Sequence, residues 1–177
     1  MFTETTFRML TRAVAAAMLL ATCAMAAQAA GDKRVERGRY LVESIAGCGN
    51  CHTPQGPNGP LAGKALAGGL LFKEAPFDAV SANITPDPET GIGKWTDAQI
   101  ALAIREGKRP DGTLIGPPMP FGLYRGISDN DVAAIVAYLR TVPPVKNAVP
   151  KSVYRMPLPP AYGPPVGKVA DVPPSDK

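Results

Sequence analysis

Two cysteines and the only histidine of the 177-residue chain stand together in the segment Cys48-Gly49-Asn50-Cys51-His52. This C-x-x-C-H spacing is the attachment motif for c-type haem. Two thiols one helical turn apart can add to the two vinyl groups on one edge of a porphyrin. The next residue then brings an imidazole over the iron. The motif therefore predicts one covalently bound haem c, attached through Cys48 and Cys51, with His52 as the proximal iron ligand.

Other chemistry for these residues explains less of the sequence. A thioredoxin-like C-x-x-C stands at a helix start beside a βαβ pattern, and no such pattern is visible. A structural zinc site needs a second pair of ligands, and the remaining cysteine, Cys23, falls in the predicted leader described below. A disulfide between Cys48 and Cys51 is chemically possible but leaves His52 unexplained.

The sixth iron ligand cannot be a second histidine, so the candidates are Met119, Met156, a lysine, water or no ligand. Met119 stands in Gly116-Pro117-Pro118-Met119-Pro120, where prolines fix φ and stiffen the backbone. A thioether ligand stabilises ferrous iron and raises the reduction potential. The sequence favours Met119 as the distal ligand and Met156 as a packing residue, and ordinary apolar packing is the alternative for both.

The first 29 residues are predicted to be a secretory signal peptide. Arg8 and Arg12 precede an unbroken apolar run over residues 13–21, and Ala27-Gln28-Ala29 has small residues where a signal peptidase cleaves. The alternatives are an uncleaved anchor and a buried helix. Cys23 follows a lipoprotein-like box with an unusual Thr before it, and we interpret it as discarded with the leader. The expected location is the periplasm, with membrane association possible but not required.

Composition indicates one globular domain with appendages. Hydrophobic residues make up 45% of the chain and charged residues 19%, which lies outside the disordered range. The net charge is only +4 and no Lys/Arg cluster stands out, so nucleic-acid binding is not indicated. We assign residues 30–142 to this domain and residues 143–177 to an extended Pro-rich tail, because residues 141–177 hold 10 of the 20 prolines.

Three helices are predicted to position the motif. The first covers residues 32–46, with Val35, Leu41, Val42 and Ile45 near one face. The second starts at the capping box of residues 96–99 and stops at Gly107. The third starts at a capping Ser128 and carries an apolar stripe through residues 132–139. Residues 56–93 are rich in Gly and Pro, and within them residues 66–72 and 77–82 form either a short hairpin or a pocket lining.

Further motifs extend the pattern around the haem motif. They are Arg37-Gly38-Arg39-Tyr40-Leu41, Asn83-Ile84-Thr85-Pro86-Asp87, Thr90-Gly91-Ile92-Gly93 with Trp95, Ile104-Arg105-Glu106-Gly107, Arg109-Pro110-Asp111-Gly112 and Met119-Pro120. With these, residues 32–142 resemble a class I c-type cytochrome. The chain is most similar to the haem domains of cytochrome subunits of bacterial membrane-bound alcohol and related dehydrogenases.

The resemblance implies a role for several residues. Met119 is implied as the distal ligand, and the first and last helices are implied to cross with Gly38 and Tyr40 facing Ile135 and Leu139. Trp95 and Arg109 are candidates for contacts with the haem propionates, with core packing and a solvated loop charge as the respective alternatives. The chain departs from such subunits in size, since they often carry three haem domains and this chain has one motif and a Pro-rich tail.

These observations predict an all-α, three-helix cytochrome c fold around one haem. The expected function is that of an exported monohaem electron carrier, not an enzyme, between a periplasmic or membrane dehydrogenase and an oxidase or cytochrome acceptor. One alternative is a dedicated electron-transfer subunit that is stably bound to one dehydrogenase, with the tail as a docking arm. Another is a haem enzyme or gas sensor with an open sixth site, although no distal histidine exists for acid-base catalysis.

Overall fold

The computed structural model describes residues 28–29 and 31–158. Most of the predicted signal peptide and the tail beyond residue 158 lie outside the described residues. The chain divides into two units, Met1–Arg34 and Val35–Lys177, and the fold below is that of the second unit. Among the described residues, no helix combines the length and the apolar character needed to cross a membrane.

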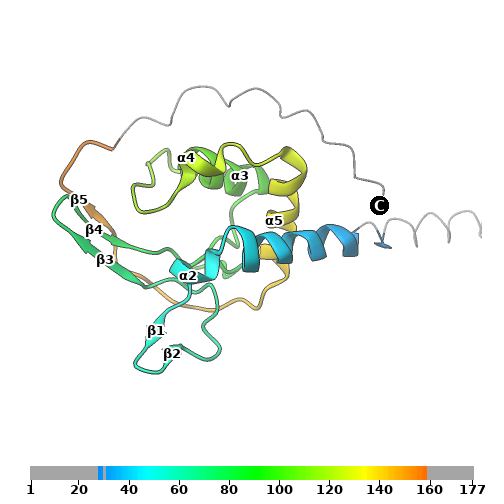
Figure 1. The fold of residues 1–177 in the computed structure, drawn as a ribbon, viewed down its shortest axis with the longest axis horizontal. Helices are drawn as coiled ribbons and strands as arrows, with labels where there is room; N and C mark the ends of the chain where they lie inside the picture. Colours follow the sequence, from blue (N-terminus) through cyan, green and yellow to red (C-terminus); the bar gives the residue numbers. More distant parts are fainter. Residues whose placement is uncertain (1–27, 30, 159–177) are drawn as a thin grey trace, which may run out of the picture. The chain divides into compact units, whose positions relative to one another are not determined.

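The helices of this unit include the three segments predicted from the sequence and two short additions (Figure 1). Residues 35–40 are helical and continue into a π-helical turn, η1. η1 and α3 each pack against α5, and α4 packs against α3. The helical elements are η1 (Leu41–Ile45), α2 (Cys48–His52), α3 (Asp97–Glu106), α4 (Phe121–Tyr124) and α5 (Asp129–Thr141).

Local capping signals fix the ends of the two long helices as predicted. The Thr96 hydroxyl accepts a hydrogen bond from the Gln99 backbone N–H, and the Gln99 side chain accepts one from the Thr96 N–H, so the capping box is complete. Gly107 ends α3 with a φ of 62°, in the left-handed region. Ser128 caps α5 by accepting from the Asp131 N–H.

The first and last helices cross closely at Gly38, as the resemblance implied. A Cβ at Gly38 would stand 1.9 Å from the carbonyl oxygen of Ala134 and 2.7 Å from the Cβ of Tyr138. The facing residues are therefore Ala134 and Tyr138 rather than Ile135 and Leu139. The implied contact of Tyr40 was wrong, because its side chain is half exposed and lies under the guanidinium of Arg37.

The π-helical turn explains a second error in the predicted first helix. The Ala46 N–H donates to the Leu41 carbonyl five residues earlier, at 2.7 Å. This wider turn rotates later side chains away from the 3.6-residue stripe. Val42 is therefore buried as predicted, whereas Ile45 is 64% exposed.

The core lies where η1, α3 and α5 meet. Buried residues of η1 and α5 form one cluster with Leu66, Ile92 and Ile100, and Trp95 packs at its edge. Burial of this apolar surface is the main term that holds the helices together. The α5 residues buried there are those of the predicted stripe: Val132, Ile135, Val136 and Leu139.

Two small antiparallel sheets make the all-α prediction incomplete. The predicted choice between a hairpin and a pocket lining resolves as a hairpin, in which Leu71 pairs with Val80 and Glu74 with Phe77. Phe77 and Ala79 alternate inward, which is a two-residue period that a mostly Gly/Pro-rich segment conceals. The strands are β1 (Gln55–Gly56), β2 (Gly59–Pro60), β3 (Leu71–Glu74), β4 (Phe77–Val80) and β5 (Val153–Tyr154), in sheet orders β1-β2 and β3-β4-β5.

Residues 145–158, called here the C-terminal strap, return along the domain after α5 (Figure 1). The carbonyl of Val145 accepts a hydrogen bond from the Asn83 side-chain amide at 2.7 Å. Farther along, the Ser152 hydroxyl accepts from the Val80 N–H at 2.9 Å, and β5 then pairs with β4. The first part of the predicted tail is therefore bound to its own domain.

Candidate functional site

Cys48, Cys51 and His52 occupy the single turn of α2. Gly47 precedes this turn with a φ of 57°, a conformation that favours glycine. The spacing i, i+3 and i+4 places the three side chains on one side of the helix. Both cysteines are half-buried free thiols. Two thiols and an imidazole therefore stand together, which is the arrangement that the attachment chemistry needs.

The imidazole of His52 is held in one orientation by the segment after β4. Its Nδ1 donates to the backbone carbonyl oxygen of Ala82 at 2.7 Å. The Gly68 N–H also donates to the His52 carbonyl at 2.6 Å, which fixes the backbone of the same residue. Nε2 then carries the lone pair that can coordinate a metal, and the hydrogen bond on Nδ1 fixes ring tautomer and orientation.

Burial lowers the pKa of His52, and the hydrogen bond to Ala82 opposes that shift only in part. The ring is therefore neutral at pH 7, which is the form that binds iron. These residues fit a haem c: a neutral, oriented imidazole next to two free thiols in one helical turn.

The two thiols lie beside the α4 end of the distal loop. Burial raises the pKa of the Cys48 thiol to about 11, and the neighbouring Cys51 adds to this rise. Burial, followed by the nearby Cys48 and Cys51, raises the pKa of Tyr124 on α4. The Tyr124 hydroxyl donates to the Ala46 carbonyl at 2.8 Å, two residues before Cys48. α4 is thus fastened directly to the start of the attachment motif.

Met119 stands in the loop that leads into α4. Pro120 begins that helix, and its carbonyl accepts from the Leu123 N–H at 2.9 Å. Phe121 is buried with its ring against Gly107, where a Cβ would lie 3.0 Å from the ring. The half-buried Met119 is therefore two residues from a core anchor and five from the Tyr124 contact. Its coordination of iron stays a prediction.

Arg109 and Trp95 have structural contacts of their own. The Arg109 guanidinium donates to the Leu114 carbonyl at 2.7 Å and so braces the turn of residues 109–114, which precedes the Met119 loop. Trp95 is partly buried against the core, and Arg140 donates to its carbonyl. Their contacts with haem propionates stay predictions, and the described hydrogen bonds link neither residue to His52.

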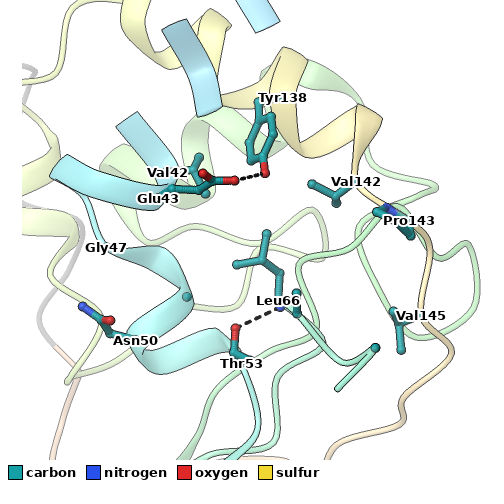
Figure 2. Close-up of a pocket in the computed structure, with 13 residues that line it drawn as sticks. Val42, Glu43, Gly47, Asn50, Thr53, Leu66, Tyr138, Val142, Pro143 and Val145 are labelled. Atoms are coloured by element: carbon teal, nitrogen blue, oxygen red, sulfur yellow. Dashed lines mark hydrogen bonds between the residues drawn. The ribbon is translucent and has the colours of Figure 1, made fainter. Parts of the chain in front are cut away.

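A cavity lies on the opposite side of α2 (Figure 2). Gly49 and Asn50, the two intervening residues of the motif, contribute to its lining, whereas Cys48, Cys51 and His52 do not. A hydrogen bond from Tyr138 to Glu43 stands at its rim. The cavity is therefore separate from the attachment face, and the Glu43–Tyr138 pair belongs to the helix crossing.

Sequence reasoning missed two supporting residues of the site. Ala82 acts through its backbone carbonyl, which every residue type carries, so no residue signal announced it. Tyr124 lies 78 residues from its partner Ala46. A tyrosine closely following the Met-Pro pair was the only available signal, and it does not specify a distant acceptor.

Comparison with known proteins agrees with this geometry. A sequence model of the cytochrome c family matches residues 35–143. One of the two kinds of nicotinate dehydrogenase chain in Pseudomonas putida is 44% identical over 125 residues, which cover 70% of this chain and 10% of that protein. The cytochrome c subunit of the quinone alcohol dehydrogenase of Gluconobacter oxydans is 38% identical over 112 residues, or 63% of this chain and 22% of the relative.

The fructose dehydrogenase cytochrome subunit of Gluconobacter japonicus is 39% identical over 126 residues, which cover 71% of this chain and 24% of that subunit. This chain thus spans about a tenth to a quarter of the length of these three curated relatives. The likeness concerns one domain within each longer protein.

Proposed function

Since this chain belongs to the cytochrome c family, we propose that it is the electron-transfer subunit of an exported dehydrogenase and carries one haem c. The relatives that are named as cytochrome subunits of dehydrogenases favour this function over that of a free carrier. The single C-x-x-C-H motif of the sequence argues for one haem per chain. The substrate oxidation itself would take place on a separate catalytic subunit.

The observation that carries the proposal is the hydrogen bond from His52 Nδ1 to the Ala82 carbonyl. It orients Nε2 on the same helical turn as the two thiols, which would hold the group through thioether bonds. The haem supplies a reversible one-electron Fe(III)/Fe(II) couple when bound. The chain itself orients the imidazole, holds it neutral and keeps its ligand nitrogen directed to one site.

Met119 is the proposed distal ligand. Its loop is bounded by Pro117, Pro118 and Pro120, whose fixed φ angles limit the positions of the intervening side chain. The anchor of Tyr124 on Ala46 joins the end of this loop to the attachment motif. A thioether at this position would favour ferrous iron and suit a carrier that accepts electrons from a dehydrogenase.

The test of this ligand compares Met119→Ala with Met156→Ala in the haem-loaded protein. We expect a low-spin spectrum with a thioether-to-iron charge-transfer band in the parent. Met119→Ala should abolish the band, and Met156→Ala, a matched change in the exposed part of the strap, should retain it. A high-spin parent spectrum, or loss of the band only in Met156→Ala, would contradict the proposed ligation.

The subunit hypothesis is tested on the native protein by gel filtration of the periplasmic and membrane fractions. We expect the haem to elute with dehydrogenase activity as one complex. Removal of residues 159–177 spares the strap and tests whether the remaining tail contributes to that complex. Elution of the full-length protein as a monomer in both fractions would instead favour the free carrier, with export itself tested by its presence in the periplasm.

A further inference from the structure

The C-terminal strap links the supports of both proposed axial ligands. At one end, Val145 accepts from the side chain of Asn83, the residue after Ala82, whose carbonyl orients His52. At the other end, the Tyr154 hydroxyl donates to the Pro117 carbonyl at 3.1 Å. Pro117 lies two residues before Met119.

Tyr154 makes both a polar and an apolar contact with the distal loop. A Cβ at Gly116 would lie 2.4 Å from the Tyr154 ring and 2.6 Å from a methyl group of Leu158. The ring therefore lies directly on the Gly116 backbone, while its hydroxyl bonds the next residue. Two successive residues of the loop are thus fixed by one side chain.

The opposite face of Tyr154 is itself well supported. Tyr154 pairs with Phe77 in the β4–β5 ladder, and the two ring centroids are 5.9 Å apart. The next residue, Arg155, donates to both carboxylate oxygens of Asp78 at 3.1 and 3.3 Å. β4 leads on to Ala82 at its far end, so the strand that supports Tyr154 also leads to the support of His52.

We propose that Tyr154 is a positioning residue for the distal ligand: it holds Gly116 and Pro117 so that the thioether of Met119 is kept at the iron. This inference rests on the proposed ligation by Met119. Between Pro117 and Met119 only Pro118 intervenes, and prolines have little φ freedom. A displacement of the Pro117 carbonyl is therefore transmitted to Met119 rather than absorbed by the loop.

The experiment measures how readily added imidazole replaces the distal ligand in the ferric, haem-loaded protein. Tyr154→Phe removes the hydrogen bond and retains the ring, and Tyr154→Leu removes the aromatic contact as well. The loss of one hydrogen bond should raise the imidazole association constant roughly five-fold. Tyr154→Leu should raise it further and weaken the thioether charge-transfer band.

Tyr138→Phe is the matched control, because it also removes one tyrosine hydroxyl bond, to Glu43 at the helix crossing. We expect its imidazole affinity to stay within two-fold of the parent, even where its thermal stability falls as much as that of Tyr154→Phe. Equal imidazole affinity in the parent and in both Tyr154 variants would overturn the positioning role, as would an equal rise in Tyr138→Phe.

Met119→Ala separates this inference from its premise. If Met119→Ala leaves the band and the imidazole affinity unchanged, the proposed ligation fails. If Met119→Ala abolishes the band while the Tyr154 variants behave as the parent, only the role of Tyr154 fails. Should Tyr154→Leu not retain haem, Tyr154→Phe alone gives the decisive comparison.

Discussion

Replacing Gly38 by alanine tests the close crossing that holds the attachment helix on α5. The new Cβ would stand 1.9 Å from the Ala134 carbonyl oxygen and 2.7 Å from Tyr138 Cβ. Real Cβ contacts stay beyond 3.0 Å, so the helices must separate by about an ångström. Since the closest obstacle is backbone, a side-chain rotation cannot relieve it.

The expected cost follows from two opposing effects. Overpacking of a tight contact costs about 3 kcal/mol at the upper end of its usual range. Alanine recovers about 1 kcal/mol through its better helix propensity. The net loss of unfolding free energy is therefore about 2 kcal/mol, which for a domain of this size lowers the Tm by about 8 °C.

Thermal unfolding of the haem-loaded protein, followed by far-UV circular dichroism, measures this loss. Gly31→Ala is the control, because Gly31 is also helical and a Cβ there would meet nothing within 4 Å. We expect the control to be neutral or slightly stabilised. A Tm of Gly38→Ala equal to or above that of the parent would refute the close crossing.

Two further substitutions test the polar contacts. Asp131→Asn breaks the two hydrogen bonds from Arg37, which hold the pKa of Asp131 below its usual value. A carboxylate with a lowered folded pKa stabilises above its unfolded pKa and loses this effect as the pH falls through the folded pKa. Urea titrations should therefore show a deficit of roughly 0.5–1 kcal/mol at pH 7 that shrinks below about pH 4, and a pH-independent deficit would contradict the pairing. Asn83→Ala leaves the buried Thr85 and the Val145 carbonyl without their amide partners, so urea unfolding should show a loss of about 3 kcal/mol, and a loss below about 0.5 kcal/mol would argue against this network.

The features that could be predicted from the sequence are those whose cause is local. Thr96, Gln99 and Gly107 bound α3 because capping acts within one turn of the chain. The attachment motif is equally local, since its three side chains fall within five residues. The absence of a side chain at Gly38 also predicted a crossing, but not that Ala134 would face it.

The remainder depends on contacts that residue types do not specify. Ile45 is exposed because a π-helical turn shifts the stripe, and that turn has no composition signal. β5 forms because Ser152 and Tyr154 find partners more than 35 residues away. Proline content predicted an extended tail correctly in its first part but could not show where that chain is bound.

The central claim is that one haem cycles between its two oxidation states with the same protein ligands. A redox titration of the purified holoprotein, monitored by visible absorption, tests it most directly. We predict a single one-electron transition between two low-spin spectra, with the haem retained on the denatured chain through Cys48 and Cys51. A high-spin reduced spectrum, a second transition, or haem that dissociates on denaturation would contradict the claim.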